Sequence, residues 1–532
     1  PGSWGLYGRA ELLGGGGGAP APPGTVEVVA TFDCPAPATE VRFTTSFVPG
    51  DPAASHRFAG SGVGVGDLDG DDRLDLVVPG PTRLRTWRQT GPPRAPRFAP
   101  FPLAPTVEAS GAEATATALA DVDGDGDLDV YVARFGPPDA LLLNDGAGRL
   151  VPVDDPVIGV PHHGQSVAFV DLDADGRLDI VVSGHGPVAA DEGQTAIDGP
   201  ADPTRLLMQQ PAEGLGRFVD VGPTVSPDAQ AAYTFVATPT HLDADGRIDL
   251  LLANDFPVFR PNQALRQVDG GYQLAPETGL HVAAAGMGVA ASDLNDDGWD
   301  DFVLPVWNRL VHLRSIDGTS PHWVEAQSAT GLLVGRPDPA WIGWGADFGD
   351  LDADGRVDLV VGFGHLDTVG VRTAGGTSAA NALEQPDQVW SLESDGTFLR
   401  RTWGLEHRGV TRGVLVVDLD HDGWLDVVRR DLEGPVRVDH AACGLSHTLE
   451  VALEPPSAAV GATVALRAGP QWLTRTVRAG GISLGSAGPP EAHFGLGEHT
   501  EVRDLTITWP DGLTTAVPGR ISADRRLRIR RP

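Results

Sequence analysis

Seven times along the chain, a short apolar run is followed by a dense acidic stretch and then by a second apolar run. In the third copy, Ser166–Val170 is small and apolar, Asp171–Asp179 reads DLDADGRLD, and Ile180–Val182 is apolar again. Two β-prone runs joined by a tight polar loop predict a β-hairpin. Two more short apolar runs follow most copies, so each unit of roughly 50 residues predicts four strands.

Repeated four-stranded units predict an all-β fold, a seven-bladed β-propeller with calcium loops, which we place at residues 25–440. Residues 441–532 alternate with the period of a strand and predict a small C-terminal β-sandwich-like domain. Residues 1–24 contain GGGGG followed by APAPPG and predict a flexible N-terminal segment and linker. We expect the stretch near Thr25–Phe47 to pair with the last blade.

Carboxylates recur at positions 1, 3, 5 and 9 of the nine-residue acidic loops, except that His241 stands at position 1 of the fourth loop and Asn295 at position 3 of the fifth. Such a cluster repels itself unless a cation lies between the groups, and oxygen ligands in a wide wrap suit Ca²⁺. Position 7 is variable, as expected if its backbone carbonyl is a ligand. We expect about six to seven structural Ca²⁺ ions; the alternative is a set of ordinary polar turns. The fourth loop begins with His241 instead of aspartate, so we expect it to be empty or weaker. The expected ligands are Asp67, Asp69, Asp71 and Asp75; Asp121, Asp123, Asp125 and Asp129; Asp171, Asp173, Asp175 and Asp179; Asp243, Asp245 and Asp249; Asp293, Asn295, Asp297 and Asp301; Asp350, Asp352, Asp354 and Asp358; and Asp418, Asp420, Asp422 and Asp426.

These loops resemble the FG-GAP/VCBS calcium-binding repeats of integrin α-subunit propellers. The stretches VGATVALRAG and HFGLGEHTEVRDLTITWPDG resemble an ASPIC/UnbV domain, and Gly286–Leu304 and Gly343–His365 are similar to blades of the cartilage acidic protein-like family. That family joins such a propeller to such a domain. The resemblance implies a secreted calcium-binding protein and fixes no activity. One departure is the shortened stretch EPPSAAVGA, where the family has an Asn-rich loop.

The charge and composition of the chain limit the classes of binding partner and the compartment that we expect. The chain has 72 acidic and 39 basic residues, a net charge of -33, which argues against nucleic acid and anionic membranes as partners. No apolar run reaches the ~18 residues of a membrane span. The chain begins without Met or a signal peptide, so we read it as processed or truncated. We expect an extracytoplasmic monomer, secreted, periplasmic or on the cell surface. Cys34 and Cys443 are either unrelated thiols or one disulfide.

A possible ligand face lies opposite the acidic loops, where the first strands begin. The residues six positions before the loops are chemically mixed, and we expect them to surround one axial opening. This ring comprises Ser61, Thr115, Gln165, Phe235, Met287, Trp344 and Arg412. With the strand ends beside it, the face offers these candidate ligand residues: His162, His163, Gln165, His185, Asp255, Trp341, Trp344, His365 and Arg412. The plainer interpretation is an axial plug with ordinary surface polarity.

Two functions fit these patterns. The first is a secreted calcium-binding propeller that binds a protein, glycan or small molecule through the metal-free face or the C-terminal domain. The alternative is an enzyme at the axial mouth, acting on a glycan or small molecule, with calcium purely structural. A third hypothesis is a purely structural component of an envelope or matrix. The sequence shows no nucleophile–base–acid set, so catalytic residues stay unassigned.

Overall fold

The computed structural model describes residues 8–9, 12–14, 23–49, 62–110, 113–191, 194–197, 199–212, 214–225, 232–316, 321–335, 341–365, 384–432 and 434–532. Strands dominate these residues, and the helices are short: α1 (Pro105–Ser110), α2 (Gly222–Val225), the 3-10 turn η2 (Pro276–Thr278) and α3 (Pro456–Ala459). The prediction of an all-β fold is confirmed.

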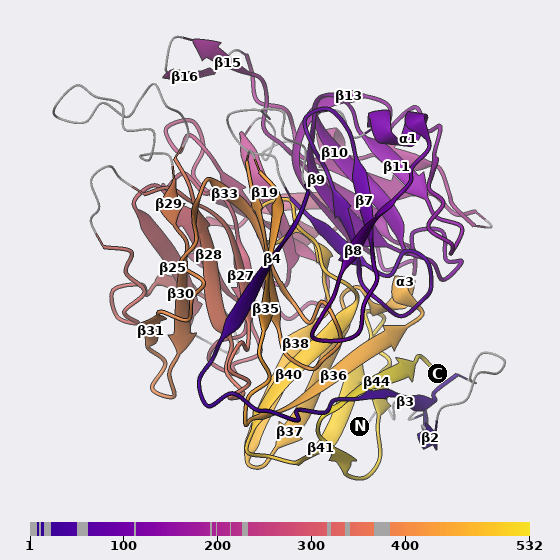
Figure 1. The fold of residues 1–532 in the computed structure, drawn as a ribbon. Helices are drawn as coiled ribbons and strands as arrows, with labels where there is room; N and C mark the ends of the chain where they lie inside the picture. The colour runs from indigo at the N-terminus through magenta and orange to yellow at the C-terminus, as the bar shows by residue number, and fades with distance from the viewer. Residues whose placement is uncertain are drawn as a thin grey trace, which may run out of the picture.

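The propeller body consists of four-stranded antiparallel units, and an acidic loop joins the first and second strand of each (Figure 1). In chain order the units are β5 (Gly64–Gly66), β6 (Asp75–Val78), β7 (Arg85–Gln89) and β8 (Phe98–Phe101); β9 (Ala114–Ala120), β10 (Asp129–Pro138), β11 (Ala140–Leu143) and β12 (Val151–Pro152); β13 (Pro161–Val170), β14 (Asp179–Gly184), β17 (Arg205–Gln209) and β18 (Phe218–Asp220); β19 (Thr234–Thr240), β20 (Asp249–Asn254), β21 (Gln263–Val268) and β22 (Gly271–Leu274); β23 (Ala290–Ser292), β24 (Asp301–Val306), β25 (Arg309–Ser315) and β26 (Trp323–Glu325); β27 (Gly343–Gly349), β28 (Asp358–Phe363), β30 (Gln388–Leu392) and β31 (Phe398–Arg401); and β33 (Thr411–Val417), β34 (Asp426–Asp431), β35 (Val436–Ala441) and β4 (Phe43–Val48).

The second strands are apolar on both sides because each unit packs between two neighbours. All six residues of β14 and all six of β20 are buried. One core cluster joins Val181 of β14 to Leu250 and Leu252 of β20, so the core lies between consecutive units. Two small antiparallel pairs lie outside the units: the hairpin of β15 (Val188–Asp191) with β16 (Gln194–Ile197), and β29 (Gln385–Pro386) with β32 (Arg408–Gly409).

An N-terminal strand closes the ring of units. β4 pairs antiparallel with β35 of the last unit, which confirms the predicted pairing for this strand. Cys34 and Cys443 form a disulfide with their Cα atoms 5.9 Å apart, so of the two alternatives the structure shows the disulfide. The propeller boundary at residue 25 is wrong, because β3 (Val26–Thr31) pairs with the C-terminal strand β44 (Arg525–Arg530) and not with a blade.

The C-terminal module is a sandwich of two sheets around one apolar core. One sheet has the order β2 (Leu12–Gly14), β3, β44, β36 (His447–Glu454), β40 (Glu491–Gly497). The other has the order β1 (Gly8–Arg9), β42 (Thr514–Ala516), β41 (Glu501–Thr508), β37 (Thr463–Ala468), β38 (Gln471–Thr476), with β43 (Ile521–Ser522) beside β41. β39 (Ala479–Gly480) leaves the module and pairs with β13 of the propeller.

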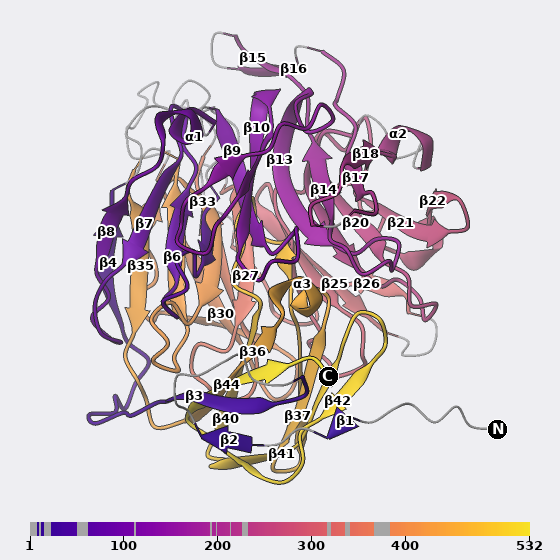
Figure 2. The same ribbon diagram turned by 90° about the vertical axis from the view of Figure 1, so that its right-hand side faces the viewer.

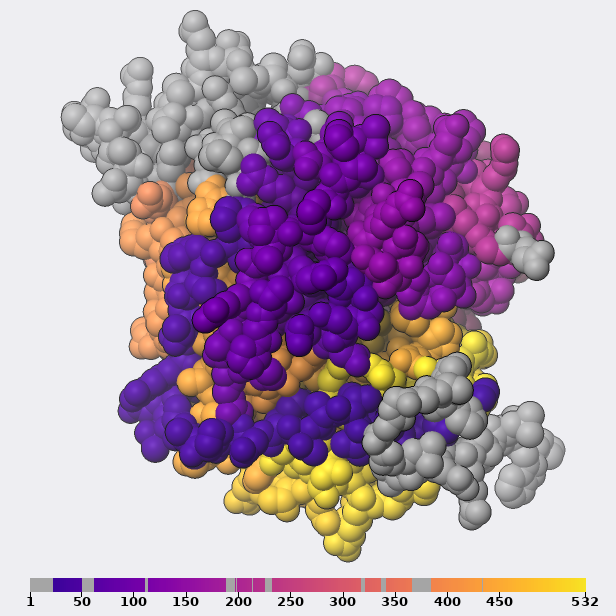
Figure 3. Space-filling model, turned by 45° about the vertical axis from the view of Figure 1, so that its right-hand side comes forward, coloured from indigo at the N-terminus to yellow at the C-terminus, as the bar shows by residue number. Residues whose placement is uncertain are grey.

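The module docks on the face of the propeller that carries the acidic loops (Figures 1 and 2). The N–H of Gly497 donates to the carbonyl of Ala353, and His493 Nε2 donates to the carbonyl of Gly423; both acceptors lie in acidic loops. Figure 3 shows the N-terminal strand segment in indigo, running between the propeller and the yellow module. The β15–β16 hairpin lies at the opposite end of the molecule.

Candidate functional site

Six of the acidic loops begin with an aspartate, and the backbone of the loop wraps around this carboxylate. In the third loop, Asp171 accepts hydrogen bonds from the backbone N–H groups of Asp175 at 3.1 Å and Gly176 at 2.8 Å. Gly176 has a φ of 88°, so glycine meets the left-handed turn that this wrap requires. The same pattern recurs in the loops that begin with Asp67, Asp293, Asp350 and Asp418.

The aspartate at position 9 is buried in every loop, and in six of them it accepts an N–H in or just after the third strand. Asp179 accepts the N–H of Leu172 at 2.9 Å and the N–H of Gln209 at 2.8 Å. Burial raises the pKa of Asp179 to about 7, although these two hydrogen bonds oppose the shift. Burial also raises the pKa of Asp129 to about 8. A metal-free loop therefore holds a carboxylate that resists ionisation, and a bound cation would remove that penalty.

The donor sets of the loops fit a hard cation. In the first three loops, carboxylate oxygens from three aspartates lie within 4.8 Å of one another. Asp69, Asp121, Asp352 and Asp420 each have a buried carboxylate oxygen without a hydrogen-bond partner. Oxygen-only sets with unused lone pairs are the ligands that Ca²⁺ prefers. Calcium at these positions stays a prediction.

Two loops depart from the common pattern. In the fourth, the imidazole Nδ1 of His241 donates to the carbonyl of Arg247 at 2.8 Å, and that carbonyl is the expected backbone ligand at position 7. In the seventh, Arg94 of the first unit pairs with Asp422 at 2.9 Å, and its backbone N–H donates to Asp420 at 2.6 Å. Side chains of the protein thus occupy these two loops in part.

The ring of residues six positions before the loops does not surround an open mouth, and this expectation is wrong. Trp344 and Arg412 are fully buried, and the guanidinium lies 3.9 Å from the centre of the indole ring. Phe235 packs edge-on against Trp344 at 5.9 Å. Thr115, Gln165 and Met287 are buried as well, while Ser61 lies outside the described residues. Among the described members, the ring is part of the core.

The axis is filled by a segment of the C-terminal module that the sequence analysis missed. This axial loop, residues 479–488, begins with β39 and contacts first strands around the axis. The N–H of Val65 donates to Ala487, that of Thr117 to Gly485, and that of Val289 to Ser483. The residues that directly follow the ring members, such as Gly62, Ala116 and Gly288, are small and make room for this loop. A Cβ at Gly62 would lie 1.7 Å from the carbonyl oxygen of Gly485.

The other candidate residues of that face are mostly buried in local pairs. His162 and His185 are buried, and His185 Nε2 lies 3.8 Å from the carboxylate of Asp255. His365, with 9% of its surface exposed, lies 5.8 Å from the ring of Trp307. The half-buried members are Trp341 and His163, and His163 pairs with Asp202 at 2.8 Å. None of these candidate residues lines the cavity between the propeller and the C-terminal module.

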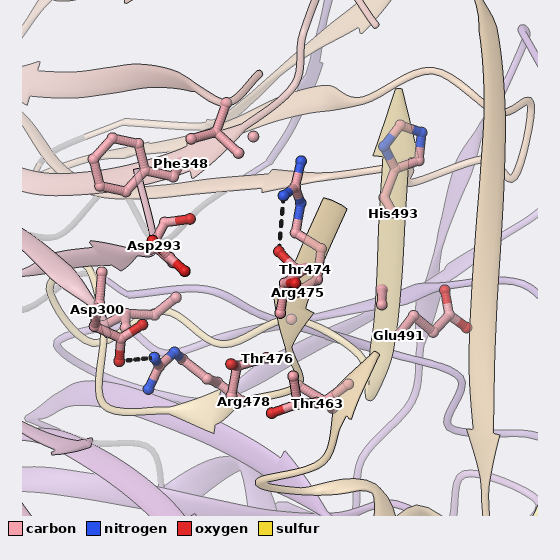
Figure 4. A pocket seen from close by; sticks show the side chains of 18 of the residues that line it. Asp293, Asp300, Phe348, Thr463, Thr474, Arg475, Thr476, Arg478, Glu491 and His493 are labelled. Carbon is pink, nitrogen blue, oxygen red and sulfur yellow. Dashed lines mark hydrogen bonds and ion pairs between the residues drawn. The ribbon is translucent and has the colours of Figure 1, made fainter. Parts of the chain in front are cut away.

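This cavity, of about 430 Å³, lies between the acidic-loop face and the C-terminal module (Figure 4). Its propeller wall includes Asp293, Asp300, Phe348 and Asp350, and its module wall includes Thr463, Thr474, Arg475, Thr476, Arg478, Glu491 and His493.

Arg475 projects between the two walls. One guanidinium nitrogen, Nη1, donates to the carbonyl of Thr474 at 2.9 Å, whereas Nη2 is buried without a hydrogen-bond partner. Burial lowers the pKa of Arg475, and the nearby carboxylates Asp350, Asp296 and Asp293 oppose the shift. By contrast, Arg478 has a fixed partner in Asp300 at 2.5 Å. Arg475 is therefore the cationic donor that this cavity can offer to an anionic ligand.

The fold and this arrangement define a class: a β-propeller of acidic-loop repeats capped on its loop face by a β-sandwich. Residues 67–132, 121–182 and 241–304 match the model of the FG-GAP-like repeat. Residues 453–532 match the model named ASPIC and UnbV. The chain thus carries FG-GAP-like repeats and, at its C-terminal end, a domain that matches the ASPIC and UnbV model.

A curated relative is cartilage acidic protein 1 of Mus musculus, 30% identical over 242 residues, which cover 43% of this chain and 34% of the relative. The matched part thus spans about a third of that protein. Solved structures of similar architecture are more distant. A lectin from Agrocybe aegerita that recognises non-reducing terminal N-acetylglucosamine is 16% identical, with a TM-score of 0.40 over 75% of this chain and 94% of the lectin. A rhamnogalacturonan lyase from Bacillus licheniformis is 13% identical, with a TM-score of 0.29 over 76% of this chain and 91% of the lyase.

The described residues include no helix long and apolar enough to span a bilayer.

Proposed function

We propose that the protein is an extracytoplasmic, calcium-loaded binding protein whose ligand site is the cavity between the propeller and the C-terminal module. The observation that carries this proposal is the position of Arg475, with an unpaired buried donor in a cavity walled by acidic loops. Calcium in the loops would offset the carboxylates opposite Arg475. A small anionic molecule, such as a carboxylate or an acidic sugar, would then supply the missing acceptor.

Calcium loading is supported by the repeated carboxylate clusters and by their unused buried oxygens. Extracellular Ca²⁺ modules bind at roughly 10⁻⁴–10⁻³ M, which suits a compartment rich in calcium. At about ten times Kd each site contributes ~1.4 kcal/mol, so six sites give about 8 kcal/mol. With an unfolding entropy of about 2.1 cal/mol/K per residue, that corresponds to roughly 7 °C for a chain of 532 residues.

Metal analysis and thermal melts test this part. We expect six or seven Ca²⁺ per chain by elemental analysis, a fall of at least about 7 °C after chelation, and poor rescue by Mg²⁺, which resists giving up its water shell. His241→Asp should raise the stoichiometry by one if the fourth loop is empty. An unchanged melting midpoint after verified metal removal would show that the loops are ordinary turns.

Ligand binding is tested separately in Ca²⁺-saturated protein. A panel of dicarboxylates, sugar acids and inorganic phosphate is screened by thermal shift against wild type and Arg475→Met. The matched control is Arg503→Met, an exposed arginine of the same module that pairs with Glu501. A ligand whose stabilisation is lost only in Arg475→Met supports the site. A panel that stabilises all three proteins equally contradicts it.

A second candidate is partner binding through the face opposite the acidic loops. Val258 is 85% exposed, Phe259 59% and Trp307 46%, and all three follow second strands at that face. Exposed aromatic and aliphatic residues of this kind occur in protein interfaces. The axial enzyme is less well supported, because Trp344 and Arg412 are fully buried. Pull-down with Trp307→Ser against wild type would test the second candidate.

A further inference from the structure

The seventh acidic loop differs from the others at its fourth position. This residue is His421, where the other loops have Gly, Ala or Asp. Its φ is 53°, which is uncommon for a residue other than glycine. The side chain of His421 is 9% exposed; its Nε2 has no hydrogen-bond partner, and its Nδ1 has no contact of hydrogen-bond geometry besides a close carboxylate. A buried imidazole with an unused nitrogen needs an explanation, since buried polar groups are nearly always satisfied.

Carboxylates of the C-terminal module face this imidazole across the interface. Glu450 on β36 has Oε1 3.3 Å from His421 Nδ1, and Glu491 at the start of β40 has Oε2 4.0 Å from the same nitrogen. Glu450 is 2% exposed, and its Oε2 accepts no hydrogen bond. With Asp418 of the acidic loop, ligand atoms of three residues (Asp418, His421 and Glu450) lie within 4.8 Å of one another.

The charge of this cluster also suits a divalent cation. Asp418, Glu450 and Glu491 are three carboxylates, and Arg526, which pairs with Glu491, is the guanidinium beside them. With a neutral imidazole the formal charge is -2, so one divalent ion would neutralise it. A simple ion-pair network is the competing explanation, with His421 protonated between the two glutamates.

We propose that Asp418, His421 and Glu450, with Glu491 beside them, form a site for a transition-metal ion such as Zn²⁺ between the propeller and the C-terminal module. An imidazole nitrogen among carboxylates favours Zn²⁺ and its neighbours, whereas Ca²⁺ takes oxygen ligands. Three protein ligands leave a coordination position open, as in catalytic zinc sites.

The carboxylates of this site also face the ligand cavity. Asp418, Glu450 and Glu491 all line the cavity between the modules. An anionic ligand there would complete the coordination of the metal, on the same side as Arg475. This last step rests on the proposed function, while the metal site itself does not. Asp418 is the residue that the site shares with a predicted calcium loop.

The test uses the full chain, stripped by chelation and then saturated with millimolar Ca²⁺, so that oxygen-only sites are filled. Co²⁺ is titrated as a spectroscopic substitute for Zn²⁺, and bound metal is measured by elemental analysis. We expect one Co²⁺ per chain in wild type, displaced by Zn²⁺, with visible absorption bands of a site that contains nitrogen. His421→Gln should weaken Co²⁺ binding at least about 100-fold, since even outer-shell partners contribute 10–100-fold.

The matched control is His493→Gln, because His493 lies at the same interface but bonds a backbone carbonyl. It should keep its Co²⁺. Ca²⁺-saturated wild type that binds no Co²⁺ overturns the proposal, as does His421→Gln with unchanged affinity. The wild-type titration answers the question even if a variant fails to fold. Ca²⁺ stoichiometry measured on the same samples reports on the acidic loops separately, so the two proposals can fail independently.

Discussion

Leu484 offers the sharpest test of the axial loop. It belongs to the C-terminal module, yet it is 1% exposed and packs in one cluster with Phe235, Met287 and Trp344 of the propeller. Leu484→Ala removes the apolar surface that anchors the loop and leaves a cavity. Substitutions of this kind cost about 2–5 kcal/mol. The control is Leu445→Ala, because Leu445 is 68% exposed and its loss should cost within about 0.5 kcal/mol.

Two measurements distinguish a loss of axial-loop anchoring from a general loss of protein stability. Equilibrium unfolding in urea gives the free energy for both variants. Hydrogen exchange at the first strands reports whether the loop still occupies the axis, since Val65 and Val289 donate to its carbonyls. We expect faster exchange at both amides in Leu484→Ala and wild-type exchange in the control. Equal unfolding free energies for the two variants, with unchanged exchange, would refute the assigned role of the loop.

Three further predictions concern packing, the disulfide and pH. Gly345→Ala should destabilise the protein by about 1–3 kcal/mol, because its Cβ would lie 2.4 Å from the carbonyl oxygen of Arg412, whereas Gly434→Ala meets its nearest atom at 3.5 Å; urea unfolding compares them. Replacing both cysteines by serine opens a link between positions 409 residues apart and should lower stability by up to about 5 kcal/mol, measured in the same way with the reduced wild type as reference. Burial lowers the pKa of His312 to about 4. The stability that the neutral imidazole contributes to the folded protein is therefore fully present above pH 6.5 and is lost as the pH falls towards 4. Wild type should therefore lose roughly 3 kcal/mol more than His312→Gln between pH 7.5 and 4, and equal losses would contradict the assignment.

The parts of the fold that could be predicted follow from the local spacing of carboxylates and apolar runs within each repeat. The carboxylate pattern places the loop between first and second strands because two β-prone runs joined by a short polar loop form a hairpin. Pairing of β4 with β35 follows from the need to close a ring of sheets. The replacement of aspartate by His241 likewise marks the loop in which an imidazole bonds the expected ligand carbonyl.

Contacts between modules could not be predicted in this way. Arg475 and Glu450 read as ordinary strand residues, and only the docking of the module brings them to one cavity. From the sequence, Trp344 and Arg412 were expected around an open mouth, because the repeats carry no information about the distant loop that fills the axis. The signal that existed was the stretch GGISLGSAG, in which Gly480, Gly481 and Gly485 all have positive φ.

The docking of the module on the acidic face has an electrostatic reason. The carboxylates on the acidic-loop face repel one another when metal is absent. The module brings arginines to this face: Arg478 pairs with Asp300, and Arg526 and Arg528 lie against Asp72. The attachment does not depend on charge alone, because β3, the disulfide and the axial loop hold the module as well. A module anchored this firmly would stay in place when metal leaves. Loss of metal would then change the charge of the cavity more than its shape, which makes ligand affinity the property expected to follow calcium most closely.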